Sequence, residues 1–524
     1  MSVTTDLQSI QVPYATKKDG GGNVLILGAA IFTGMLSLLP LAFVMHVTLF
    51  SGWQTVAELV FRPKVGALLL NTLTLLTLVL PLSALLAGCF AWLIERTDIP
   101  LARLWSWIMV APLAVPAFVH SYAWSAFAPR FHGLGAAVLV STLAYLPFIY
   151  LPAAAQLRRL DPALEETAQS MGKSPLIVFL RVVLPQLRLA LMGGALLIGL
   201  HLLAEYGLFV LTRFDTFATV IVDQFQSVGN GPATNLLGSV LVLLSLVLFG
   251  IETRFRGRER YARVGSGAAR TERRAKLGTW RWPALALLTT FALLSLAVPA
   301  WTLARWLAAG GVEIWRVDFI LPALVQTALL TLAGASLTTL AALPIAWLVV
   351  RAPSRVHKLL EAAHAYVGAL PGVIIALALV TVTVNVALPL YQTVATLLLA
   401  YLLMFLPRAL VGLRTSIAQA PPELEQAAMS LGRSPIAAIW HTTIRLAAPG
   451  ALASAALTGL GITTELTATL MLAPNGMRTL AMRFWSYTSE LDLASAAPYA
   501  LLMILLSVPL VVLLHGQADH ATAA

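Results

Sequence analysis

The sequence LEETAQSMGKSP at residues 164–175 recurs as LEQAAMSLGRSP at residues 424–435. In each copy, a helix-compatible run of Leu, Glu and Ala is followed by Gly and then by Ser-Pro at the same spacing. Such self-similarity within one chain indicates a tandem repeat. Long apolar segments flank both copies. The duplicated unit is therefore expected to be a membrane-spanning one.

The duplication extends through the rest of the chain. The matching positions are Ala91-Trp92-Leu93 and Ala346-Trp347-Leu348, Arg96 and Arg351, Pro116 and Pro371, Leu146-Pro147 and Leu406-Pro407, and Glu205 and Glu465. Because an even number of helices separates the copies, both halves should enter the membrane in the same direction. They would then be related by a pseudo-two-fold axis along the bilayer normal. A transport pathway on that axis is expected.

The composition excludes a water-soluble protein. Of the 524 residues, 59% are hydrophobic and only 11% are charged, and the mean hydropathy is +0.84. A bilayer core needs about 20 apolar residues per helix. Twelve stretches satisfy this, at residues 24–49, 65–94, 101–128, 133–157, 187–210, 234–253, 283–309, 320–350, 359–383, 388–412, 447–472 and 494–515. The fold class is predicted to be an all-α polytopic membrane protein with two six-helix units. The first stretch is too long for a secretory signal and is expected to remain as an anchor.

Basic residues indicate the orientation. With the N-terminus in the cytoplasm, all but eight of the 34 Lys and Arg residues fall on the cytoplasmic side, as the positive-inside rule requires. Both termini are therefore predicted to be cytoplasmic. The net charge of +11 follows from this topology, so nucleic-acid binding is not needed to explain it. The Arg-rich join at residues 254–281 is interpreted as a flexible linker.

These observations divide the chain into successive parts. The expected parts are the N-terminus with the first helix (1–64), a first repeated unit (65–254), a basic linker (255–282), the seventh helix with an outer segment (283–319), a second repeated unit (320–515) and a cytoplasmic tail (516–524). Cys89 is the only cysteine, which excludes disulfides within the chain and cysteine metal clusters. It is expected to be a packed apolar thiol.

The repeated loop between the fourth and fifth helices predicts a helix, a sharp turn and a second helix. Asp161-Pro162 is a helix start signal, and Gly172 with Ser174-Pro175 breaks that helix. A short amphipathic helix on the cytoplasmic face, present twice, suits a groove on a partner protein. Gly172-Lys173-Ser174 looks like the end of a P-loop, but Thr167 stands where that motif requires glycine. ATP binding by this route is not expected.

The loop resembles that of ABC importer permeases, which carry Glu-Ala-Ala, three residues, Gly, nine residues and Ile-x-Leu-Pro. The first copy matches with Glu166-Thr167-Ala168, Gly172 and Val182-Val183-Leu184-Pro185, whereas the second has Gln426 in place of Glu and ends in Thr442-Thr443-Ile444-Arg445. The resemblance implies docking loops that contain Glu165, Glu166, Ala168, Gly172, Glu425, Gln426, Ala428 and Gly432.

The same resemblance implies the partners and the location of the protein. Two ATPase subunits would carry ATP and Mg²⁺, so this chain would be a transport subunit without a cofactor and not an enzyme. A periplasmic binding protein would deliver the substrate, and the protein would lie in a bacterial inner membrane. Gln426 implies that the second docking helix couples differently from the first.

Two acidic residues lie within predicted membrane helices, where ionisable groups are costly and usually face a functional cavity. Glu205 and Glu465 occupy matching places far along the fifth helix of each half, which predicts a position near the periplasmic mouth. His201 precedes Glu205 by four residues and shares its helix face. The three side chains are candidates for transient contact with a metal ion. Alternatively, the glutamates are gate residues held by hydrogen bonds.

Further segments resemble ferric-iron permeases within this superfamily. They are Ala204-Glu205-Tyr206-Gly207, Asp215-Thr216-Phe217, residues 464–470, Pro474, Thr479-Leu480-Ala481 and residues 496–500. The resemblance covers residues 24–515 and implies a pathway that includes Tyr206. Fused permeases for thiamine, polyamines and aminoethylphosphonate look similar. Pro116 and Pro371 are the expected bends in the third helices, unless they are only tolerated in the packing.

Two other classes share parts of this pattern. A secondary transporter of six plus six helices has the same repeat but is expected to carry coupling acids or broken helices near mid-membrane. A channel would need rings of polar residues along a pore. The paired docking loops favour the ABC importer over both.

Overall fold

The computed structural model shows an all-helical chain. It describes residues 20–160, 165, 167–168, 170–228, 232–256, 274–351, 354, 363–364 and 366–523. Within these residues, extended pairing is limited to an isolated parallel bridge between Thr97 and Ala275. The predicted all-α class is confirmed.

The first half contains α1 (Gly20–Phe50), α2 (Trp53–Val60), α3 (Pro63–Arg96), α4 (Ala102–Val110), α5 (Ala117–Phe127), α6 (Leu134–Tyr145), α7 (Pro147–Arg159), α9 (Pro175–Val178), α10 (Leu184–Ala204), α11 (Gly207–Leu211), α12 (Phe217–Val228) and α13 (Pro232–Arg256). The second half contains α14 (Arg281–Ala292), α15 (Val298–Gly310), α16 (Val317–Arg351), α18 (Gly372–Val386), α19 (Val394–Gln419), α20 (Pro422–Ser430), α21 (Pro435–Ile439), α22 (Arg445–Thr463), α23 (Thr467–Leu472), α24 (Leu480–Ser489) and α25 (Leu493–Ala523). Short π-helical segments at Phe179–Val183 and Trp440–Ile444 join the loop helices α9 and α21 to α10 and α22. Another joins α14 to α15.

The described residues contain nine helices that are long and apolar enough to cross a membrane. Two further candidates are bent pairs: α4 with α5, at 93°, and α6 with α7, at 41°. The one remaining expected stretch, the ninth at 359–383, lies partly outside the described residues, and the helix Gly372–Val386 that overlaps it is short. This arrangement is compatible with the prediction of twelve spans without confirming that number.

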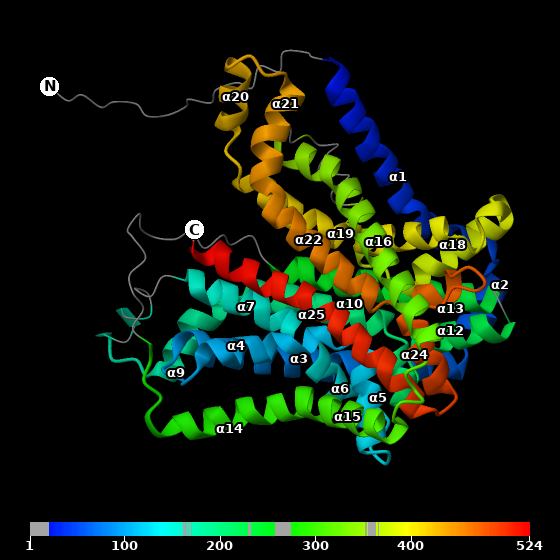
Figure 1. The fold of residues 1–524 in the computed structure, drawn as a ribbon, viewed down its shortest axis with the longest axis horizontal. Helices are drawn as coiled ribbons and strands as arrows, with labels where there is room; N and C mark the ends of the chain where they lie inside the picture. The colour runs from blue at the N-terminus through cyan, green and yellow to red at the C-terminus, as the bar shows by residue number, and fades with distance from the viewer. Residues whose placement is uncertain are drawn as a thin grey trace.

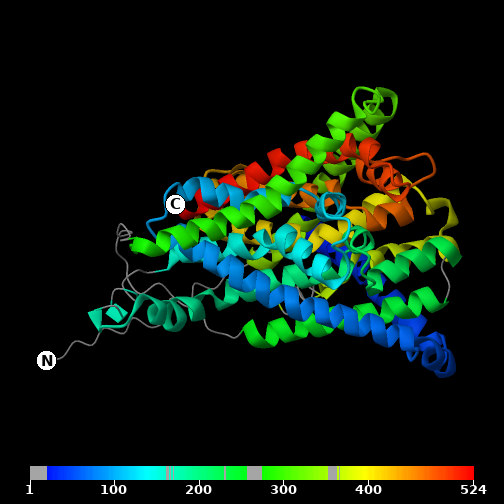
Figure 2. The ribbon, with the colours of Figure 1, turned by 90° about the horizontal axis from the view of Figure 1, so that it is seen from below.

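The first helix of each half packs against the other half. Helix α1 of the first half contacts α16 and α18 of the second, and α15 of the second half contacts α5 of the first. In Figures 1 and 2, α14 and α15 lie along the outside of the first half, whereas α1 lies beside α16. Each six-helix unit therefore packs its first helix on the other unit, an arrangement called helix exchange below. The units are not separate bodies joined only by a linker.

The two ends of the molecule differ. Figure 1 shows α9, α20 and the end of α25 on one side, and α2 and α24 on the opposite side. Trp280 and Trp282 are 73% and 74% exposed at the start of α14, as is typical of the aromatic belt at a membrane surface. Cys89 is partly buried against the core within α3, in agreement with a packed thiol.

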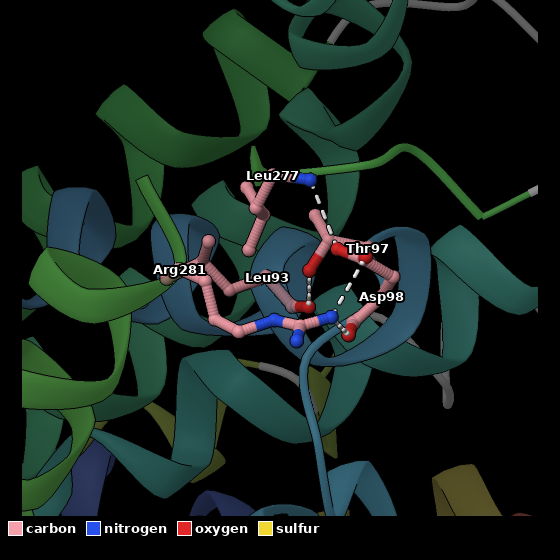
Figure 3. A network of polar contacts seen from close by, with 5 residues as sticks. All are labelled: Leu93, Thr97, Asp98, Leu277 and Arg281. Atoms are coloured by element: carbon pink, nitrogen blue, oxygen red, sulfur yellow. Dashed lines mark hydrogen bonds and ion pairs between the residues drawn. The ribbon is translucent and has the colours of Figure 1, made fainter. Parts of the chain in front are cut away.

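The end of the basic linker is attached to the first half. Asp98 accepts hydrogen bonds from the backbone N–H of Leu277 at 2.9 Å and from Nη2 of Arg281 at 2.9 Å (Figure 3). The backbone of Asp98 also donates to the carbonyl of Ala275 at 3.0 Å. Residues 257–273 of the predicted linker lie outside the described residues. The end of this segment that the structure describes is held to the first half by hydrogen bonds to Asp98, which the interpretation as a flexible linker did not predict.

Candidate translocation and docking sites

A cavity of about 160 Å³ lies where the two halves meet. Its polar lining comes mainly from Tyr145, His201 and Glu205 of the first half and from Arg408 and Glu465 of the second. The structure therefore places His201, Glu205 and Glu465 in the lining of one cavity. It also adds Arg408, which the sequence reasoning missed.

Glu205 ends one helix and starts the next. Helix α10 stops at Ala204, and the Glu205 carboxylate accepts a hydrogen bond from the backbone N–H of Leu208 at 3.0 Å, in the first turn of α11. Its other oxygen accepts from the hydroxyl of Tyr145. The expected helix at 187–210 was wrong at this point. A side-chain acceptor competes with the helical hydrogen bonds and turns the chain.

Glu465 makes the corresponding contacts in the second half. Its carboxylate accepts from the backbone N–H groups of Ala468 and Thr469, both at 2.9 Å, and from the Thr469 hydroxyl at 2.7 Å. Helix α22 accordingly ends at Thr463, although the expected helix at 447–472 ran through it. Both glutamates are thus held by hydrogen bonds and line the cavity, and their role as gate residues stays a prediction.

His201 is held by two hydrogen bonds. Its Nδ1 lies 2.7 Å from the carbonyl oxygen of Leu197, which can only accept, so Nδ1 carries a proton. Its Nε2 then accepts from Nη2 of Arg408 at 3.1 Å. A metal ion would have to displace Arg408 to reach this lone pair. In the described part of the chain, no group of three His, Cys, Asp or Glu residues is placed to hold a metal ion. A transient metal contact at Glu205, Glu465 and His201 stays a prediction.

Both prolines stand at the start of a helix. Pro116 is the N-cap of α5 at the 93° bend and lines the cavity. Pro371 is the N-cap of α18, and the neighbouring Gly372 packs against Met404, whose Cε would have to move if a Cβ were added there, because the two atoms would lie 2.4 Å apart. Tyr206, predicted to lie on the pathway, does not line this cavity. Its hydroxyl donates to Asp223 at 3.3 Å.

The docking loops share one backbone turn. Gly172 has φ +76° and Gly432 has φ +85°, both in the left-handed region that favours glycine. Beside them, the N–H of Lys173 bonds to the carbonyl of Ala168 at 3.3 Å, and the N–H of Arg433 bonds to that of Ala428 at 3.2 Å. This is the glycine-terminated helix end known from Schellman motifs. The predicted break at both glycines is confirmed.

A buried arginine ties each docking loop to a membrane helix. Nη2 of Arg96, at the end of α3, lies 3.7 Å from Glu165, and Nη2 of Arg351, at the end of α16, lies 3.1 Å from Glu425. Burial raises the pKa of Glu165, and Arg96 opposes that shift. The hydroxyl of Thr443 also donates to Glu425. The repeated Arg and Glu therefore act together across the loop.

The predicted docking residues divide between two faces of the second loop. Glu425 and Ala428 face the protein, whereas Gln426 is exposed. Glu166, its counterpart in the first loop, lies outside the described residues, and Ala168 is half-buried. Met171 and Leu431, which directly precede the two glycines, are 72% and 85% exposed. The sequence reasoning missed this matched pair of apolar tips, although the repeat displays it.

Known proteins are similar to this chain in sequence. The family described as Binding-protein-dependent transport system inner membrane component matches residues 332–521. The Fe(3+)-transport system permease protein FbpB 2 of Haemophilus influenzae is 34% identical over 91% of this chain and 95% of its own. The ferric transport system permease protein FbpB of Actinobacillus pleuropneumoniae is 22% identical over 72% of this chain and 58% of its own. The sulfate transport system permease protein CysT of Escherichia coli is 28% identical over 44% of this chain and 92% of its own.

Proposed function

The chain belongs to the family of permease components of binding-protein-dependent transport systems, and on this premise we propose that it forms the inner-membrane pathway of an ABC importer for ferric iron. The observation that carries the proposal is the relative named as an Fe(3+)-transport permease, which aligns along nearly the whole chain. The carboxylates of Glu205 and Glu465 at the cavity suit a hard cation.

The docking loops support two ATPase subunits as partners. Each loop presents an exposed apolar tip, Met171 or Leu431, on a turn fixed by a left-handed glycine. Each is also held to a membrane helix by an ion pair, so a push on the loop is transmitted to α3 or α16. ATP and Mg²⁺ belong to the partner subunits. The loops and both termini then face the cytoplasm, and a periplasmic binding protein delivers iron to the opposite side.

Transport follows from alternating access. ATP-driven closure of the ATPase subunits moves the docking loops and opens the cavity outward, and reopening releases the ion inward. Pro116 lines the cavity at the 93° bend, and Pro371 stands at the matching place before α18, so these two prolines are the proposed hinges. Glu205 and Glu465 gate the pathway and contact the cargo as it passes.

The test is uptake of radioactive ferric iron by proteoliposomes that contain the chain with its candidate ATPase and binding protein. We expect uptake to require ATP and both partners. Leu431→Asp should lower uptake at least tenfold and release the ATPase subunit during purification. Val312→Asp is the control, because Val312 is 87% exposed in the turn after α15, away from the docking loops, and should leave ATPase copurification unchanged. Uptake by the chain alone, driven by an ion gradient, would overturn the proposal.

A further inference from the structure

The cavity contains a positively charged side chain, that of Arg408, which the import of a cation does not explain. Arg408 lies on α19, and its guanidinium donates to His201 and lies 5.0 Å over the ring of Phe405. Among the described residues, no carboxylate is within ion-pairing distance of Arg408. Arg408 is half-buried, and a guanidinium that is partly removed from water without a counter-ion is costly, so such groups are usually paired or face a ligand.

The two glutamates of the cavity do not neutralise Arg408. Each carboxylate is already engaged by N–H and hydroxyl donors of its own half. Of the five N–H donors of Arg408, one is used by His201. Arg408 lines the cavity, and its side-chain nitrogens are not among the buried atoms that lack a hydrogen-bond partner. The donors that His201 does not use are therefore open to the cavity. A planar guanidinium presents such donors in the geometry that fits an oxyanion.

The repeat shows that this charge is not a structural requirement of the fold. Phe148 occupies the position of Arg408 in the first half, and Gly461 occupies the position of His201 in the second. All four residues line the cavity. The glutamates of the cavity are therefore present in both halves of the repeat, whereas Arg408 and His201 each occur in one half only. A charge present in only one of two equivalent places suits a ligand whose two sides differ.

We propose that Arg408 binds an oxyanion of the cargo, so that the ferric ion crosses the cavity together with an anion and not alone. This inference rests on the proposed function. Phosphate, carbonate and carboxylate groups share the required chemistry of two oxygens that accept from one guanidinium. A bare trivalent cation would be repelled by Arg408, whereas a paired cation and anion meets Glu205 or Glu465 on one side and Arg408 on the other.

The test measures anion binding and anion transport separately. The full chain in nanodiscs is titrated with ³²P-phosphate and ³⁵S-sulfate, and the complete importer is then given ⁵⁵Fe(III) with ³²P-phosphate. The variants are Arg408→Gln and Arg408→Lys, and Arg414→Gln is the control on an exposed part of the same helix. We expect saturable anion binding and joint uptake of ³²P and ⁵⁵Fe in the wild type, both at least tenfold lower in Arg408→Gln and partly kept in Arg408→Lys.

The other outcomes separate this inference from the proposed function. Absence of saturable binding to the wild type, or full iron uptake by Arg408→Gln, would overturn the anion site and leave the iron importer standing. Uptake of ³⁵S-sulfate or ³²P-phosphate without iron, lost in Arg408→Gln, would support the anion site with a free oxyanion as its source, and would overturn iron as the cargo. Melting temperatures of all variants show whether a loss reflects misfolding.

Discussion

Single carboxylates decide where the fifth helix of each half ends. Glu205 and Glu465 lie in an apolar setting, yet each accepts hydrogen bonds from backbone N–H groups three or four residues further on. In water these backbone N–H groups could bond to solvent instead, but in an apolar setting they would be left without an acceptor if the carboxylate were absent. The same contact that turns the chain therefore holds the charge beside the cavity. The predicted role as gate residues rests on this double function.

The two glutamates differ in the hydroxyl that donates to them, Tyr145 for Glu205 and Thr469 for Glu465, which leads to a testable asymmetry. Tyr145 donates to a charged carboxylate, whereas the hydroxyls of Tyr401 and Thr469 bond to each other at 2.7 Å. Tyr145→Phe should cost about 1.5–3 kcal/mol, and Tyr401→Phe about 0.5–1.5 kcal/mol, because hydrogen bonds to charged groups are the stronger ones. Thermal unfolding of both variants in nanodiscs checks this. Equal losses, or a larger loss for Tyr401→Phe, would contradict the charged acceptor.

Among the elements, the docking helices owe their position to tertiary contacts more than to their own propensity. Helix α20 has only nine residues, which is too short to be stable alone. The glycine turn ends it, and the ion pair between Arg351 and Glu425 holds it to α16. The first loop repeats both features with Gly172 and the pair of Arg96 and Glu165. A partner that moves this helix must therefore move the end of a membrane helix with it.

The ion pair of the second loop is expected to show strong coupling in a double-mutant cycle. Arg351 and Glu425 are only 9% and 13% exposed, so removal of either leaves a largely buried charge without its partner. Arg351→Met or Glu425→Gln should each destabilise the loop by about 3 kcal/mol, and the double variant should recover part of this loss. Hydrogen exchange of the amides in α20 reports the change. Additive losses would show that the two charges do not act as a pair.

The sequence predicted most elements, and its misses have physical causes. Apolar length revealed the long helices, and the repeat revealed both docking loops. The length of an apolar stretch cannot show that a carboxylate within it ends a helix, so the breaks at Glu205 and Glu465 were missed. Arg408 was missed because a search for matched positions passes over a residue whose counterpart is Phe148. The contacts of Arg281 with Asp98 join residues far apart in sequence, and no local pattern announces them.

At the scale of the whole molecule, the Asp98 tether fixes the start of the second half to the first half. The N–H of Leu277, and the nearby Arg281, hold the pKa of Asp98 below its usual value. Because the folded pKa is the lower one, the contribution of this group is fully present above the ordinary Asp value of about 3.9 and is lost as the pH falls through the lowered value. The tether should therefore stay closed at every physiological pH.

A spin label tests this pH dependence. Lys276 is exposed beside the tether and can be replaced by a labelled cysteine in a Cys89→Ser background. The label should be immobile at pH 7 and at pH 5 and should become mobile only below the ordinary Asp pKa of about 3.9. Asp98→Ala should make it mobile at pH 7. A label that loosens already between pH 7 and pH 5 would assign the titration to another group.

Helix exchange makes the two halves one body, so the covalent join is not what keeps them together. Helix α1 packs on α16 and α18, α15 packs on α5, and the hydroxyl of Tyr122 donates to the carbonyl of Leu493 at 2.6 Å. The rings of Phe118 and Phe484 lie 5.3 Å apart across the same boundary. Between membrane helices such close packing and hydrogen bonds, more than hydrophobicity, supply the attraction. A cut within residues 257–273 removes none of these contacts.

The chain should therefore work when expressed as two pieces divided within residues 257–273. An affinity tag on the first piece should copurify the second in equal amount, and iron uptake should stay within about twofold of the intact chain. Adding Asp98→Ala should weaken copurification only slightly, because the tether is one contact among many. Deletion of residues 1–52, which removes α1, should weaken copurification more than Asp98→Ala does, because the packing of α1 on α16 and α18 is lost while that of α15 on α5 remains. Pieces that separate in mild detergent without that deletion would mean that the linker, and not the exchanged helices, holds the halves in register.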